Sequence, residues 1–167
     1  MKEYHKIHSV YKRDPANNHK TFLEGDFSLP EFGFLKDRPW VATEKVDGAN
    51  IRVMFDGNTI TYGGKTDEAQ IPATLITRLN ERFLPQREKF AESFPDGVCL
   101  YGEGYGAKIQ KGGGNYRQDQ DFCLFDVRVG EWWLQREDVE DVAFKLGLDV
   151  VPILGTQTLE EWVEVVR

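Results

Sequence analysis

The most informative segment of the sequence is Glu44-Lys45-Val46-Asp47-Gly48-Ala49-Asn50, which stands between strand-like segments at residues 40–45 and 50–55. A lysine amine is protonated near neutral pH and is then a poor nucleophile. Desolvation, a nearby cation or a bound metal would each favour the neutral, nucleophilic form. The pattern therefore marks Lys45 as a candidate covalent nucleophile. Asp47 could orient it or contact a hydrated metal, and Gly48 lets the backbone pass close to a phosphate or ribose. The alternative is a plain hairpin with a surface lysine.

The bulk composition is that of a globular protein. The 167 residues are 40% hydrophobic and 13% aromatic, which predicts one domain over residues 1–167 with a sizeable core. No apolar stretch is long enough to span a membrane, and the N-terminus lacks the apolar core of a signal peptide. Cys99 and Cys123 lie in apolar runs, so we expect reduced core thiols in a cytoplasmic protein. All histidines lie within the first nineteen residues, so a His/Cys metal site is not expected.

The net charge of −7 argues against a protein that coats nucleic acid, because phosphate binding usually requires a basic face. An enzyme that grips strand ends needs only a few local cations, and the charge does not exclude it.

Hydrophobic spacing and turn residues predict an α+β fold with antiparallel or mixed sheets and peripheral helices. Within residues 50–55, alternation places Asn50 and Arg52 on one face of a strand. Asp56-Gly57-Asn58 is a hairpin signal. Residues 14–34 are rich in Asn, Pro, Gly and Asp and are expected to be loop. The other strands are expected at residues 6–12, 59–62, 97–101, 122–129, 131–134 and 149–154. Helices are expected from 72 to about 85, over 136–146 and from 159.

A second candidate segment is Leu100-Tyr101-Gly102-Glu103-Gly104-Tyr105-Gly106, which reads as a strand running into a glycine-rich bend. Glycines on both sides of Glu103 suit close approach to a ligand, and the alternative is a turn with a solvated glutamate. The third glycine of a dinucleotide fingerprint is missing. Lys108 and Lys111 follow and add two cations.

A third segment is Asp121-Phe122-Cys123-Leu124-Phe125-Asp126-Val127. An acid inside an apolar strand costs free energy unless it is paired or bound to a ligand, so Asp126 requires a partner. The alternative is a core phenylalanine, Phe125, followed by an aspartate at a strand end.

The K-x-D-G-x-N pattern of residues 45–50 resembles the signature of ATP-dependent RNA ligases. These enzymes belong to the covalent nucleotidyltransferase superfamily, with DNA ligases and mRNA capping enzymes. The second and third segments resemble motifs III and IIIa of this family, in the right order. The resemblance covers nearly the whole chain, including residues 4–14, and implies the nucleotidyltransferase fold of a ligase adenylation domain. Asn50 stands where DNA ligases generally carry arginine, which favours RNA.

The resemblance implies a role for each matching residue. Lys45 would attack the α-phosphate of ATP and carry AMP, with Asp47 and Glu103 as further catalytic residues that support Mg²⁺ through water. Phe125 would stack on adenine and Glu44 would help to read it. Further residues expected at the nucleotide are Asn50, Arg52, Glu103 and Lys65, the last in place of a more usual arginine. The implied cofactors are ATP and Mg²⁺, and the implied partner is RNA with a 5′-phosphate and a 3′-hydroxyl.

The chain departs from the family at its C-terminal end. No E-G-x-V element of motif IV and no K-x-K element of motif V follows Val127. We therefore expect an incomplete adenylation domain that binds ATP weakly and does not seal RNA alone. A partner chain or a missing C-terminal segment would supply these motifs. The alternatives are a catalytically weak module that binds nucleotides or RNA ends, and a DNA ligase or capping-type transferase.

Overall fold

The computed structural model describes residues 1–167 and divides the chain into two compact units. The larger unit comprises Met1–Tyr4 and Lys45–Val151, and the smaller one comprises His5–Glu44 and Pro152–Arg167. The expectation of a single domain over the whole chain stays a prediction. None of the helices has the length and apolar character needed to cross a membrane.

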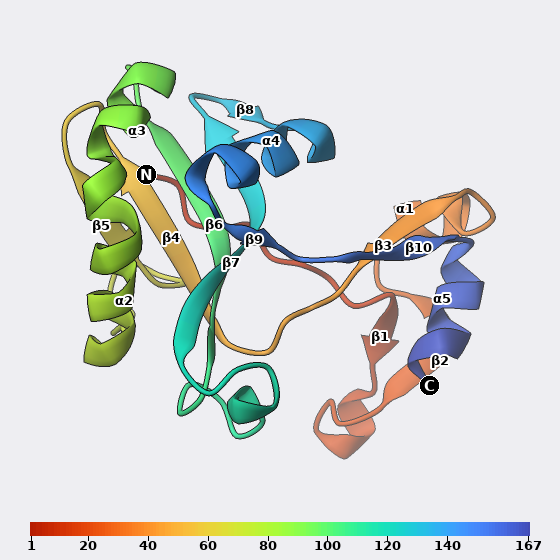
Figure 1. Ribbon diagram of the computed structural model, residues 1–167. Helices are drawn as coiled ribbons and strands as arrows, with labels where there is room; N and C mark the ends of the chain where they lie inside the picture. The colour runs from red at the N-terminus through yellow and green to blue at the C-terminus, as the bar shows by residue number, and fades with distance from the viewer. The chain divides into compact units, whose positions relative to one another are not determined.

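The larger unit is built on a six-stranded sheet with the order β5-β4-β6-β7-β8, and β9 pairs with β7 (Figure 1). Every neighbouring pair is antiparallel except β7 and β9. The strands are β4 (Ala49–Phe55), β5 (Ile60–Gly63), β6 (Val98–Gly106), β7 (Gln120–Val129), β8 (Trp132–Trp133) and β9 (Asp149–Val150). The helices are α2 (Ala73–Phe83), α3 (Arg87–Ser93) and α4 (Arg136–Leu146), with 3₁₀ turns η2 (Leu84–Gln86) and η3 (Gly113–Asn115). This mixed architecture confirms the predicted α+β class.

One face of the sheet is covered by helices α2, α3 and α4, whose apolar residues share a single core with the strands. In α2, Leu75, Leu79 and Phe83 recur every four residues and are fully buried, which is the spacing of one helix face. Pro72 precedes the helix and a 3₁₀ turn containing Pro85 follows it, as predicted. The core residues of the strands include Ile51, Val53, Phe55, Leu100, Phe122, Leu124 and Val127.

The opposite face of the sheet, here called the site face, carries the alternate residues of the same strands. On β4 and β6, Asn50 lies opposite Glu103 and Arg52 lies opposite Tyr101. Between β6 and β7 the register shifts: Tyr101 pairs with Asp126, but Gly102 pairs with Leu124.

Phe125 is therefore the extra residue of a β-bulge, which re-aims neighbouring side chains. Leu124 and Val127 stay in the core. Phe125 and Asp126 both contact Tyr4 away from that core.

The smaller unit consists of two short antiparallel pairs and two helices. Strand β1 (Tyr11–Arg13) pairs with β2 (Phe22–Phe27), and β3 (Trp40–Thr43) pairs with β10 (Ile153–Gln157). Helix α1 (Pro30–Leu35) follows β2, with a 3₁₀ turn η1 (Pro15–Asn17) earlier in the chain. Helix α5 (Leu159–Val166) begins at a capping box formed by Thr158 and Glu161, and Trp162 Nε1 donates to the carbonyl oxygen of Trp40 at 2.9 Å.

Several predicted elements were wrong. The first strand spans only Tyr11–Arg13, and residues 14–34 hold β2 and α1 rather than loop alone. The predicted bend after residue 101 is a continuous strand, because β6 runs on through its glycines to Gly106. A Cβ at Gly104 would overlap the side chain of Leu75 on α2, so glycine here permits close packing of the helix. The strand expected over 149–154 is two strands, interrupted by Val151 and Pro152.

Candidate active site

Val46 fixes the segment that carries the candidate nucleophile. Its side chain is buried against Cys123 and Val151, with Tyr105 and Phe125 packed beside them. Lys45 and Asp47, its two neighbours in the chain, are both exposed. A buried residue between two exposed ones anchors the backbone and presents both polar side chains to solvent. Packing of Val46 therefore positions the lysine and the aspartate together.

Gly48 brings this segment into contact with β6. A Cβ at residue 48 would overlap the carbonyl oxygen of Gly104, and would lie 3.0 Å from Cγ of Glu103. Any larger residue would push the segment away from the strand. The glycine of the pattern is thus explained by close approach of two backbones, and this approach places the Lys45 segment beside Glu103.

Glu103 lies on the site face of β6 and is half-buried. Burial raises the pKa of this carboxyl to about 6, and the charge of Asp47 adds to the rise. The positive charge of Lys45 and a hydrogen bond from the Gly48 N–H oppose it. The charges of Lys45 and Asp47 therefore both act on Glu103, and a shared catalytic site of these three residues stays a prediction.

Asn50 faces Glu103 across the sheet. Its Oδ1 atom is buried and has no hydrogen-bond partner within the protein. A buried polar atom without a partner is costly, and such atoms in a folded protein need an explanation. An unpaired acceptor beside Glu103 fits a site in which a bound ligand donates a hydrogen bond to Asn50.

Phe125 and Asp126 occupy the neighbouring part of the site face. The Phe125 ring packs against the cluster of Val46, Cys123 and Val151, and it meets the Tyr4 ring edge-on at a centroid distance of 5.0 Å. Asp126 accepts a hydrogen bond from the Tyr4 hydroxyl at 2.8 Å. This bond supplies the partner that an acid in an apolar strand requires. Adenine stacking by Phe125 stays a prediction.

Arg52 was expected to contact the nucleotide, but its side chain is fully buried. It donates to the carbonyl oxygen of Gly64 at 3.0 Å, to that of Met1 at 3.0 Å and to Asp67 Oδ1 at 2.7 Å. A direct contact with a nucleotide would require these bonds to open. The bond from Arg52 holds the carbonyl oxygen of Gly64, the residue before the exposed Lys65, and the expected contact of Arg52 with the nucleotide stays a prediction.

The loop between β6 and β7 forms hydrogen bonds with the segment that carries Lys45. Gln110 Nε2 donates to the carbonyl oxygen of Gly48 at 3.0 Å, and the Asp47 N–H donates to the Tyr116 hydroxyl at 3.3 Å. Arg117 anchors the end of this loop through paired bonds to Asp119. Lys108 and Lys111 are exposed on the same loop, and Lys108 has a left-handed backbone with φ of 67°.

Glu44 belongs to the smaller unit. It is half-buried just after β3, and its N–H donates to the carbonyl oxygen of Pro152 at 3.0 Å. Its expected role in reading adenine stays a prediction.

The carboxylates of the site fit a Mg²⁺ ion that is bound mainly through water and substrate. No group of three or more His, Cys, Asp or Glu side chains is placed to hold a metal ion, but Asp47 and Glu103 come together. Mg²⁺ is commonly bound by one or two carboxylates, several waters and substrate phosphates. Two carboxylates beside an exposed lysine fit a metal that arrives with a nucleotide, so Asp47 and Glu103 are the residues that would hold it.

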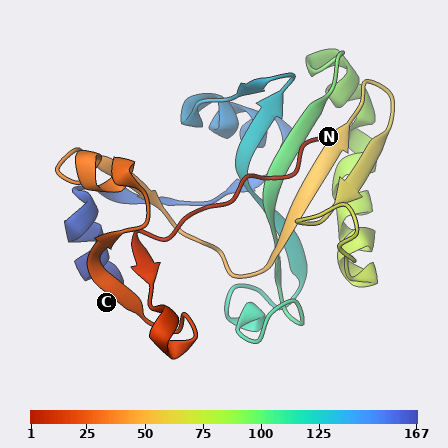
Figure 2. The same ribbon diagram turned by 180° about the vertical axis from the view of Figure 1, so that it is seen from behind.

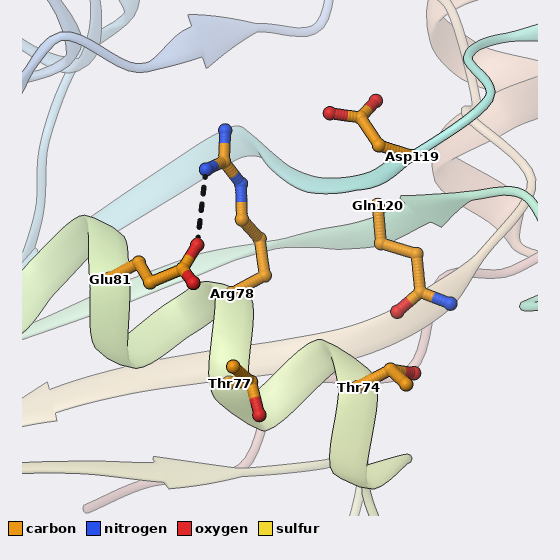
Figure 3. Close-up of a pocket in the computed structure, with 6 residues that line it drawn as sticks. All are labelled: Thr74, Thr77, Arg78, Glu81, Asp119 and Gln120. Carbon is orange, nitrogen blue, oxygen red and sulfur yellow. Dashed lines mark hydrogen bonds and ion pairs between the residues drawn. The ribbon is translucent and has the colours of Figure 1, made fainter.

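A polar cavity of about 270 Å³ lies elsewhere, between α2 and the start of β7 (Figure 3). Its lining residues are Thr74, Thr77, Arg78, Glu81, Asp119 and Gln120. In Figure 3, Arg78 pairs with Glu81 on the same helix. Because α2 covers the core face of the sheet, this cavity is separate from the site face.

Beneath the same region, the fully buried Asp121 accepts bonds from Arg78, Arg82 and Arg117. Burial by itself would raise its pKa, but the bonds from Arg82 and the Phe122 N–H and the nearby arginine charges outweigh it and lower the pKa to about 2. This cluster ties α2 to β7 and is structural.

Sequence reasoning missed several residues of the site. Alternation along β6 could have placed Tyr101 and Tyr105 on the same face as Glu103. Nothing local marks Gln110 and Tyr116, whose partners lie 62 and 69 residues away.

Comparison with known proteins bears on the fold and the family. A family model described as RNA ligase matches residues 38–166. No curated protein matches the chain. Among solved structures, a lysine-to-methionine variant of Naegleria gruberi RNA ligase with AMP and Mn is 21% identical. Its TM-score is 0.65, and the match covers 81% of this chain and 43% of that one.

Two further structures of the Naegleria gruberi enzyme are similar. A lysine-to-alanine variant with ATP and Mn is 22% identical with a TM-score of 0.63, and an apo aspartate-to-alanine variant is 23% identical with a TM-score of 0.61. Each match covers 78% of this chain and 40% of the other, so the chain spans about two fifths of the length of these structures. These likenesses confirm the predicted nucleotidyltransferase fold.

Proposed function

Because the chain belongs to the RNA ligase family, we propose that its larger unit is a lysine nucleotidyltransferase that takes AMP from ATP. The observation that carries this proposal is the grouping of Lys45, Asp47 and Glu103, which the buried Val46 and the close approach at Gly48 bring together. The exposed lysine supplies the nucleophile, and the two nearby carboxylates supply binding groups for a hydrated metal.

In the first step, the neutral amine of Lys45 attacks the α-phosphorus of ATP. A nitrogen–phosphorus bond forms, the bond to the β-phosphate oxygen breaks, pyrophosphate leaves and the amine loses a proton to solvent. Mg²⁺ bound with the nucleotide would neutralise phosphate charge. Asp47 and Glu103 would hold the hydrated metal, and Phe125 would stack on adenine. Catalysis rests on positioning and charge neutralisation.

In the later steps, AMP passes to an RNA 5′-phosphate, and a 3′-hydroxyl displaces it to seal the strand. The glutamate and paired lysines that the resemblance implies would come from a segment beyond residue 167 or from a partner chain. We place this activity in the cytoplasm, because the two buried cysteines of the larger unit, Cys99 and Cys123, form no disulfide, as is usual in a reducing compartment.

The test is label transfer from ATP carrying a radioactive α-phosphate, with GTP and a Lys45→Ala variant as controls. The proposal requires magnesium-dependent labelling by ATP, followed by discharge of AMP onto 5′-phosphorylated RNA in preference to DNA. Binding of ATP without labelling would support a non-catalytic nucleotide-binding module. Preferential labelling by GTP would support a capping-type transferase.

A further inference from the structure

The first four residues, Met1–Tyr4, form a strap that belongs to the larger unit and crosses its site face (Figure 2). One bond joins the strap to each of three adjacent strands. Arg52 on β4 donates to the carbonyl oxygen of Met1 at 3.0 Å, and the Tyr101 hydroxyl on β6 donates to that of Lys2 at 2.7 Å. The Tyr4 hydroxyl donates to Asp126 on β7 at 2.8 Å.

These contacts define where the strap ends and the candidate site begins. Arg52 and Tyr101, which pair across the sheet beneath the strap, are both 0% exposed. The next cross-strand pair on the site face, Asn50 and Glu103, is only half-buried. The strap therefore lies next to the candidate site, on the side where Phe125 is located.

Tyr4 is the residue of the strap that reaches this border. Its ring lies 5.0 Å from Phe125, 5.2 Å from Tyr101 and 5.7 Å from Trp133, measured between centroids. Tilted and edge-on arrangements of this kind are favourable beyond simple burial. Burial and the Asp126 charge raise the pKa of the Tyr4 hydroxyl, so it stays protonated and keeps donating to that carboxylate.

We propose that Tyr4 is a positioning residue for the nucleotide, acting through Phe125 and Asp126. Phe125 is the extra residue of a bulge, so its backbone has no register partner on β6, whereas the next residue, Asp126, pairs with Tyr101. Tyr4 contacts both residues with one side chain, packing on the ring and bonding the acid. The inference rests on the proposed function, because it assigns Phe125 to the base of ATP.

The test compares Tyr4→Phe, which keeps the ring and removes the hydrogen bond, with Tyr4→Ala, which removes both. Tyr62→Phe is the matched control. Tyr62 packs on the core side of the sheet, and its hydroxyl is buried without a partner, so its loss should be tolerated. Three quantities are measured on folded protein: the dissociation constant for ATP by calorimetry, and the KM and kcat of Lys45 adenylylation.

We expect Tyr4→Ala to raise both the dissociation constant and KM about tenfold, and Tyr4→Phe to raise them about threefold. The kcat should stay within about twofold in both variants, and Tyr62→Phe should match the wild type. A purely structural role would act differently: loss of folded protein lowers the apparent kcat and leaves KM unchanged.

An unchanged dissociation constant and KM in Tyr4→Ala would overturn the inference. Tighter ATP binding in that variant would also overturn it, because the strap would then cover the base site rather than help to build it. If ATP binding depends on Tyr4 but the wild type is never adenylylated, the inference stands and the proposed function fails. If the wild type does not bind ATP, both are contradicted.

Discussion

Asn50 and Glu103 lie directly opposite each other on β4 and β6, and each is unusual for its chemistry. The Asn50 Oδ1 atom is buried without a partner, and the pKa of Glu103 is raised to about 6, first by burial. The pair forms the centre of the site face next to Lys45. In the absence of a ligand, burying the polar atoms of Asn50 and Glu103 costs the protein folding free energy. Such perturbed polar groups are common at positions that bind a ligand.

The raised pKa of Glu103 predicts the pH dependence of adenylylation. Below pH 6 the free protein carries Glu103 in its protonated form, which supports a hydrated metal poorly. The kcat/KM for ATP should therefore rise with pH and level off above about 6, since this parameter reports the free enzyme. Initial rates between pH 5 and 8 give the profile. The Glu103→Gln variant should be less active, and its pH profile should lack this inflection. If its profile matches that of the wild type, the inflection belongs to another group.

Phe125 predicts a loss of nucleotide affinity. Phe125→Ala should weaken ATP binding by about 1–3 kcal/mol, the scale of base–aromatic stacking, and Phe125→Trp should keep most of the affinity. Calorimetric titration of folded variants measures both. Because Phe125 also packs against the buried cluster that contains Val46, circular dichroism must first show that each variant is folded. Equal affinity in Phe125→Ala would make Phe125 a packing residue alone.

Gln110 predicts a dependence of catalysis on the loop between β6 and β7. Gln110→Ala removes the bond to the Gly48 carbonyl oxygen, so the Lys45 segment loses one of its restraints. A net hydrogen bond contributes about 1 kcal/mol, and we expect kcat/KM for adenylylation to fall about fivefold. Gln118→Ala is the matched control, because Gln118 bonds Gly114 within the same loop. Equal losses in the two variants would indicate general loosening of the loop.

The fold was more predictable than the contacts that complete the site. The Asp56-Gly57-Asn58 hairpin, the helix over residues 136–146 and the strand leaving the Lys45 segment follow from local spacing and turn chemistry, and the structure confirms them. The bulge at Phe125 and the burial of Arg52 depend on residues far apart in the chain. Such non-local contacts leave no periodic signal. Residues 14–34 misled the prediction because their turn-forming residues interrupt β2 and α1 rather than replace them.

Asp121 predicts a stability effect outside the site. Asp121→Asn should lower the free energy of unfolding by about 3 kcal/mol, because it removes the buried charge that three part-buried arginines bond. Asp119→Asn, at an exposed partner of Arg117, should cost under about 1 kcal/mol. Denaturant unfolding at pH 7 measures both changes.

The pH dependence of unfolding gives a second check on Asp121. Its folded pKa of about 2 lies below the usual value for aspartate, about 3.9. The stabilising contribution is therefore present above about pH 4 and is lost as pH falls towards 2. The difference between wild type and Asp121→Asn should shrink over this acidic range, and a constant difference would contradict the buried ion cluster.

The most direct test of the central claim is to locate AMP on the protein. The 167-residue chain is incubated with ATP and Mg²⁺, and the intact mass and a peptide map are recorded by mass spectrometry, with Lys45→Ala and Lys65→Ala in parallel. We predict one AMP per chain, attached to Lys45, present in Lys65→Ala and absent from Lys45→Ala. An adduct that persists in Lys45→Ala, or that maps to Lys65, Lys108 or Lys111, would contradict the assignment of Lys45 as the nucleophile.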